Sequence, residues 1–435
     1  MPWRELAEPV RMQRVALVAP VAALHDVLRE VADAGTVELA RPAEGPAAGE
    51  LETYARTAVV RGEAAALAGW TPAAEVPALA ARLAGVGGAV VPTPTPRGLD
   101  PPTLLPGGGT ARRSFTPLVE TYGTVPYADV DPTVVAAGAY MLMFGMMFGD
   151  AGHGLLLVLA GLLVRAGRPA ALSRVRGLWP FVVGSGACAV VFGLLYGEFF
   201  GPTGVVPVLW LSPLEEPLTL LAVALGVGAV LLAAAQAIGT VNRWREGGWT
   251  FALASASGVA GVALLAGLGG IVLGAATGYG LLVALGVAVM VTGVALAFLG
   301  FLAASGGGGA GVTQATVEVF DAVLRLGTNL VSFARLAAFG LTHAALGMVV
   351  WDGTTALAGA GVLGLVGAVV LFVVGNAVTF ALEALVAGVQ ALRLEYYELF
   401  SRIFTAEGRP FRPWHVPLDA EAAAPASAPT SRSLP

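Results

Sequence analysis

Long apolar stretches dominate the chain from about residue 133 to residue 404, and only a few polar residues interrupt them. A helix needs about 20 apolar residues to cross a hydrocarbon core of about 30 Å. Eight stretches approach or exceed that length, at about 133–148, 151–164, 179–196, 217–239, 250–274, 279–304, 314–350 and 355–404. The pattern predicts an all-α membrane domain with about eight transmembrane helices.

The residues before 133 follow a different pattern. Residues 10–39 alternate as an apolar strand, an amphipathic helix and a second strand, which is typical of a small α/β domain. Residues 41–52 have the Pro, Gly, Ala and Glu composition of a linker. We therefore expect a cytoplasmic N-terminal α/β domain over 1–118, a linker over 119–132, the transmembrane domain over 133–404, and a cytoplasmic, mostly disordered tail over 405–435.

The composition supports this division and excludes several classes of protein. The chain of 435 residues is 56% hydrophobic and 12% charged, whereas a soluble domain carries about 25% charged residues. Residues 1–132 contain 11 Arg and 15 Asp or Glu, and residues 133–350 contain 8 Arg and 7 Asp or Glu. All 24 basic residues are Arg, which excludes P-loop and Schiff-base lysines, and the net charge of -5 gives no reason to expect nucleic acid.

The arginines in the short connections predict the orientation, because they concentrate on the cytoplasmic side of a membrane. They follow the second, fourth and eighth stretches, as Arg165, Arg168, Arg174, Arg176, Arg243, Arg245, Arg402, Arg409 and Arg412. The alternate connections, 197–216, 275–278 and 351–354, contain none. We expect a multi-pass protein of a bacterial plasma membrane with both termini in the cytoplasm.

Arg335 lies deep in the seventh stretch, at least about 15 residues from either end. An arginine at the centre of a membrane helix costs about 2.5–3.5 kcal/mol on insertion scales, so it faces protein or water and has a task, or it is paired and only holds helices together. On a helical wheel Ser332 falls within about 60° of Arg335 and His343 within about 80°. Asp321 lies 14 residues toward the cytoplasmic end of the same stretch.

The eighth stretch also carries polar residues within an apolar helix, with Glu383, Gln390 and Arg393 on one helical face. Glu383 is either a proton relay or the salt-bridge partner of an arginine. If Arg335 and Arg393 lie at similar depth, at least one of them must meet a carboxylate from elsewhere, because two positive charges in hydrocarbon repel each other. The last two stretches are also too long for one perpendicular crossing, and we favour steep tilt over a break or a cytoplasmic projection.

Asp150 and His153 lie between the first two stretches in the segment FGMMFGDAGHG. A satisfied turn pair is the favoured interpretation of these two residues over a metal site. No Cys or His cluster has the spacing of metal ligands, so we expect no metal and no cofactor.

Four segments carry a resemblance to a known family: YADVDPT followed by FGMMFGDAGHGLLL, then FGLLYGEFFG, then SFARLAAFGLTHAAL, and LEALVAGVQALRLEYYELFSRIFTAEGRPFRPW. The chain resembles the membrane subunit a, or subunit I, of V-type and archaeal/bacterial V/A-type rotary ATPases. The resemblance implies that Arg335 faces the rotor ring and that Arg393 supports it. It places further residues along two proton half-channels, namely Gln390, Glu383, His343, Asp321 and Asp150. We add Ser332, which lies on the same helical face as Arg335.

The resemblance also implies a function and its partners. The chain would be a stator subunit that forms the two half-channels against the ring and couples proton translocation to rotation, while ATP chemistry takes place on other subunits. Its partners would be the rotor ring, the peripheral stalks, the central-stalk subunit that caps the ring, and the lipid membrane. Only about 120 residues precede the membrane part, so we expect the coiled coil and far lobe of the family's cytoplasmic arm to be missing.

Two alternatives remain open at this stage. One is a secondary transporter that binds an anionic substrate at the two intramembrane arginines, although the first and last four stretches share no polar motif. The other is a membrane anchor for a cytoplasmic complex, which would not require two costly arginines.

Overall fold

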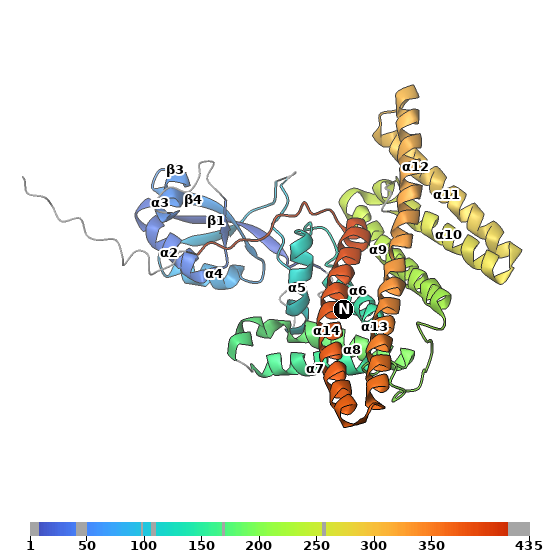
Figure 1. The fold of residues 1–435 in the computed structure, drawn as a ribbon. Coiled ribbons are helices and arrows are strands. Elements are labelled where there is room, and N and C mark those ends of the chain that lie inside the picture. Colours follow the sequence, from blue (N-terminus) through green and yellow to red (C-terminus); the bar gives the residue numbers. More distant parts are fainter. Residues whose placement is uncertain are drawn as a thin grey trace, which may run out of the picture. The chain divides into compact units, whose positions relative to one another are not determined.

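A computed structural model describes residues 8–40, 50–96, 99–105, 110–167, 170–254 and 258–415. The chain divides into two compact units (Figure 1). The smaller unit contains residues 9–105 together with the segment from 408, and the larger one contains the apolar helices up to residue 407. Most of the predicted linker over 41–52, and the tail after 415, lie outside the described residues.

The smaller unit is an antiparallel sheet with helices packed against it. Its sheet has the order β2-β4-β1-β5, and β3 pairs with β4. The elements are β1 (Met12–Pro20), α2 (Leu24–Ala34), β2 (Glu38–Leu39), α3 (Glu50–Thr57), β3 (Val59–Arg61), β4 (Ala64–Pro72), α4 (Val76–Ala84) and β5 (Ala89–Pro92), with a 3₁₀ turn at Val21–Ala23. The predicted strand, helix and strand over 10–39 are confirmed as β1, α2 and β2.

The spacing of apolar residues explains how the core of this unit is packed. Helix α2 buries Leu24, Val27, Leu28 and Val31, whose spacing of three and four residues places them on one face. The C-terminal segment completes the core, because Trp414 is 7% exposed and its N–H donates to the carbonyl of Val37 over 2.8 Å. The tail therefore contributes a core residue to the N-terminal unit, which the sequence pattern did not predict.

The larger unit consists of helices. Its elements are α5 (Thr110–Tyr122), α6 (Thr133–Met147), α7 (Ala151–Ala166), the 3₁₀ helix η2 (Ala170–Leu178), α8 (Trp179–Tyr196), α9 (Pro217–Ala254), α10 (Val259–Thr277), α11 (Gly280–Ala304), α12 (Gly308–Ser332), α13 (Ala334–Ala358), α14 (Gly361–Leu394), the π-helix η3 (Glu395–Phe400) and α15 (Ser401–Ile403). Helices α7 and α8, α10 and α11, and α13 and α14 pack as pairs (Figure 1). The protein is thus a mostly helical, multi-pass membrane protein.

The predicted number of eight membrane helices is not confirmed. Six segments of the described residues are long and apolar enough to cross a membrane, at 175–196, 217–249, 259–277, 280–304, 308–358 and 361–403. The first two predicted spans form α6 and α7, which have only 15 and 16 residues. The glycine-rich turn between them shortens both helices.

Three predicted boundaries were wrong. The connection expected at 351–354 lies inside α13, and the chain turns instead at Gly361, which has a φ of 84°. Arg243 and Arg245 belong to α9 and not to a loop after residue 239. The expected span over 250–274 is divided, because 250–254 ends α9 and α10 begins at Val259. No proline interrupts 351–358, so α13 continues through these residues. The helix that extends past residue 239 is interrupted at Gly248, whose φ of 74° and ψ of -168° are not helical.

The long segment over 308–358 contains one irregularity. Phe333 separates α12 from α13 with a φ of -74° and a ψ of -10°, so its backbone leaves regular α-helix just before Arg335. The expected tilt of this segment stays a prediction. The division of the chain into domains also stays a prediction, and α5 crosses the predicted limit at residue 118.

Candidate functional site

The first group of polar residues, the arginine cluster, consists of Arg335, Ser332, Gln390 and Glu398. Arg335 donates from Nε to the Ser332 carbonyl over 3.1 Å, from Nη1 to Gln390 Oε1 over 3.4 Å, and from Nη2 to Glu398 Oε1 over 3.0 Å. Its side chain is 23% exposed and that of Glu398 is 6% exposed. The guanidinium is therefore held between α13 and the end of α14 while part of it stays accessible.

The backbone around the cluster explains this geometry. Arg335 follows the irregularity at Phe333, which exposes the Ser332 carbonyl to the Nε donor. Glu398 lies in η3, where the wider π-helical turn follows α14, and such π segments are frequent at functional sites. Arg335 forms an ion pair with Glu398, so one of the two arginines does meet a carboxylate, while their relative depth in the membrane stays a prediction.

Sequence reasoning missed Glu398. The residue follows Arg393 by five positions in LRLEYYELF, a spacing that a regular α-helix does not place on the same face. Arg393 itself is exposed, and its charge lies within electrostatic reach of Glu398. Both predicted arginines thus act on one carboxylate that the pattern had not selected.

Asp321 lies apart from the arginine cluster. It pairs with Arg325 over 2.6 Å on α12, where both side chains are more than half exposed. Fourteen residues separate it from Arg335, about 21 Å of helix rise. The structure therefore does not bring Asp321 together with the other predicted residues.

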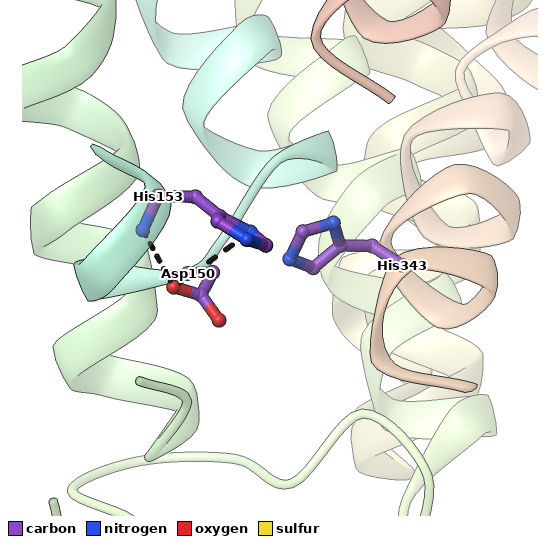
Figure 2. Close-up of side chains that lie close together, drawn as sticks. All are labelled: Asp150, His153 and His343. Carbon is purple, nitrogen blue, oxygen red and sulfur yellow. Dashed lines mark hydrogen bonds and ion pairs between the residues drawn. The ribbon is translucent and has the colours of Figure 1, made fainter. Parts of the chain in front are cut away.

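The second group, the histidine cluster, consists of Asp150, His153, Glu198, His343 and Glu383. Four of the five are 4% exposed or less, and the Glu383 side chain is 13% exposed. Asp150 and His153 come from the start of α7, Glu198 from the segment after α8, His343 from α13 and Glu383 from α14. Figure 2 shows Asp150, His153 and His343 pointing toward one another.

Asp150 is fixed by backbone donors. Its carboxylate accepts N–H bonds from His153 over 2.8 Å, Phe200 over 3.0 Å and Gly201 over 2.7 Å. It thereby caps the N-terminus of α7, which favours a negative charge. The same bonds tie the segment after α8 to the start of α7.

His343 connects the carboxylates of the cluster. Its Nδ1 contacts Glu383, and its Nε2 lies 3.9 Å from Glu198 Oε2. The ring of His153 lies against the ring of His343 with 5.7 Å between centroids. The sequence pattern did not select Glu198, because only the fold brings the segment after α8 next to α13.

Each cluster takes one residue from α13. Arg335 and His343 are eight residues apart on α13, which corresponds to about 12 Å along the axis. Each cluster also takes a residue from α14, namely Gln390 and Glu383. Carboxylates and imidazoles at hydrogen-bonding distance can pass protons between them. Arg335 fixes a positive charge at one end of this row of polar residues.

The fold and both clusters define a membrane protein that holds ionisable groups between its last helices. Residues 59–203 match the family model described as the V-type ATPase 116kDa subunit family. A-type ATP synthase subunit I of Aeropyrum pernix is 30% identical over 365 residues, covering 74% of this chain and 51% of the relative. These matches confirm the predicted resemblance: the chain is similar to subunit I of A- and V-type ATP synthases.

Further relatives agree. A-type ATP synthase subunit I of Pyrococcus horikoshii is 28% identical over 313 residues, which cover 69% of this chain and 45% of that protein. V-type ATP synthase subunit I 2 of Treponema pallidum is 47% identical over 88 residues, or 20% of this chain and 19% of its own length. The chain spans about half the length of the first two relatives.

Proposed function

We propose that the chain is the stator membrane subunit of a V/A-type rotary ATPase and forms two proton half-channels against a rotor ring. A proton enters one half-channel, neutralises a ring carboxylate, and travels with it through lipid. When that carboxylate returns, the positive charge of Arg335 favours its ionised form, and the proton leaves by the other half-channel.

The observation that carries this proposal is that Arg335 is hydrogen-bonded and yet partly exposed. Its guanidinium has three protein partners, yet its side chain is 23% exposed on a helix of an apolar domain. Burial of the whole charge would cost more desolvation free energy, and a purely structural tie between α13 and α14 needs no accessible surface. The accessible part is available to a carboxylate on another subunit.

The histidine cluster supports an outer half-channel that begins about 12 Å from Arg335. His343 and Glu383 are its central pair, and Asp150 and Glu198 lie beside them. Asp321 and Ser332 belong to the opposite, cytoplasmic side in this proposal. The orientation rests on the arginines near the ends of α7, α9 and α15, so both termini are cytoplasmic.

The proposed partners are the rotor ring, the peripheral stalks, the ring-capping subunit of the central stalk, and lipid. ATP is hydrolysed or made on other subunits. The test is to purify the chain from its native membrane in mild detergent and identify what accompanies it. We expect a small, very apolar subunit with a carboxylate in the middle of a helix. Purification of the stable chain without such a subunit would contradict the proposal and favour a transporter.

A further inference from the structure

The ring of His153 is buried without a hydrogen bond. The residue is 2% exposed, neither Nδ1 nor Nε2 makes a hydrogen bond of normal geometry to a described group, and the Asn376 side chain is close enough to interact weakly with the ring. The nearest charged group is Asp150, whose Oδ1 lies 3.9 Å from Nδ1, and Asn376 of α14 also neighbours the ring. A buried polar group without a hydrogen-bond partner loses its hydration and gains no compensating bond, which destabilises the fold.

Possible ligand atoms converge at this ring. One atom each of Asp150, His153 and His343 lies within 4.8 Å of the other two (Figure 2). Asp150 keeps capacity to bind, because Oδ2 accepts only the Gly201 N–H and a carboxylate oxygen can accept two bonds. Glu198 offers a further carboxylate, 3.9 Å from His343 Nε2.

We propose that Asp150, His153 and His343 bind a divalent transition-metal ion of the zinc class, with Glu198 as a fourth ligand. Imidazole and carboxylate together suit Zn²⁺, which bonds to nitrogen and oxygen at about 2.0–2.2 Å. Tetrahedral ligands at that distance are about 3.3 Å apart. The His153 ring packs against Phe148, Phe200 and Phe380, so binding requires it to shift toward the ion between these rings.

The contact between His343 and Glu383 agrees with this site. A histidine that binds a metal through one nitrogen usually donates its other N–H to a carboxylate or carbonyl. Glu383 contacts Nδ1 of His343 and leaves Nε2 to face Glu198. Glu383 thus orients the ligand without being one, and while the ion is bound His343 Nε2 cannot take part in the proposed proton path. Sequence spacing could not reveal this set, because His343 lies 190 positions after His153.

Metal binding is testable on the chain itself, apart from any ion transport. The full-length chain, purified in detergent without a histidine tag and stripped with a chelator, is titrated with Zn²⁺ by calorimetry. We expect one saturable site per chain, and binding weaker by at least about 100-fold in His153→Ala, because loss of a direct ligand costs more than the roughly 10–100-fold typical of a supporting residue. The chain has four histidines, and His25 is half exposed in the smaller unit. His25→Ala is therefore the matched control, with binding unchanged within about twofold.

A second probe covers the case in which His153→Ala fails to fold. Co²⁺ bound to the wild-type chain should give the strong visible absorption of a four-coordinate site, and Zn²⁺ should displace it. Absence of saturable Zn²⁺ binding in the wild type, or equal weakening in His25→Ala and His153→Ala, would overturn the proposal. Because proton pumping is not measured, a failure here is distinct from a failure of the proposed function.

Discussion

The ion pair between Arg335 and Glu398 gives the sharpest prediction about the arginine cluster. Glu398→Gln keeps the size of the side chain and one carbonyl acceptor, but it removes the negative charge that Nη2 contacts over 3.0 Å. A hydrogen bond to a charged group contributes about 1.5–3 kcal/mol. The remaining partners, Gln390 and the Ser332 carbonyl, are neutral.

Two effects of this change can be estimated. With Arg335 partly exposed, water replaces some of the lost interaction, so we expect the lower end of that range in stability, about 1.5 kcal/mol. If the same free energy positions the guanidinium toward the ring, proton pumping slows by about 10-fold, because 1.36 kcal/mol corresponds to one factor of ten in rate. The two effects should appear together in one variant.

The assay is ATP-driven acidification of membrane vesicles, followed by a pH-sensitive dye, beside thermal unfolding in detergent. Glu407→Gln is the matched control, since Glu407 is exposed in the same C-terminal region. Equal pumping rates in Glu398→Gln, Glu407→Gln and the wild type would refute a positioning role of the pair.

Three further predictions concern other carboxylates. Glu383→Gln should slow pumping less than loss of Arg335, because the amide still contacts His343, and an unchanged rate in the vesicle assay would return Glu383 to a purely structural role. Asp150→Asn should destabilise the protein by about 2 kcal/mol in thermal unfolding, since the carboxylate accepts three backbone N–H bonds, whereas exposed Asp352→Asn should not. Burial and neighbouring Glu246 raise the pKa of Asp129 from 3.8 to about 7, so its contribution to stability should fall as pH rises through that interval. Unfolding temperatures of Asp129→Asn should depend less on pH there, and an unaltered pH profile would contradict this.

Much of the fold follows from patterns that the sequence displays directly. The apolar stretches predicted most of the helices of the larger unit, and the alternating and amphipathic pattern over 10–39 predicted β1 and α2. The errors are of one kind, the positions at which helices end. Residues 351–358 and 240–247 lack proline, so polar residues such as Asp352 and Arg243 do not stop a helix there, and the interruption in α9 comes at Gly248.

The candidate site was only partly predictable, for a physical reason. Residues on one helix, such as Arg335 and His343, could be related by helical periodicity. Glu198 and Glu398 could not, because one returns to α13 through a loop and the other lies in a π-helical turn. Asp150 was predicted as a satisfied turn residue, and its carboxylate indeed accepts backbone bonds, whereas the buried ring of His153 does not share them.

The most direct test of the proposed function is proton pumping by Arg335→Ala in sealed vesicles, measured beside the ATPase activity of the assembled complex. Arg165→Ala is the control, because that arginine is exposed at the end of α7. We predict that Arg335→Ala assembles with the ring but acidifies no vesicles, while Arg165→Ala pumps normally. Pumping by Arg335→Ala at the wild-type rate would contradict the role of Arg335 as the charge that separates the two half-channels.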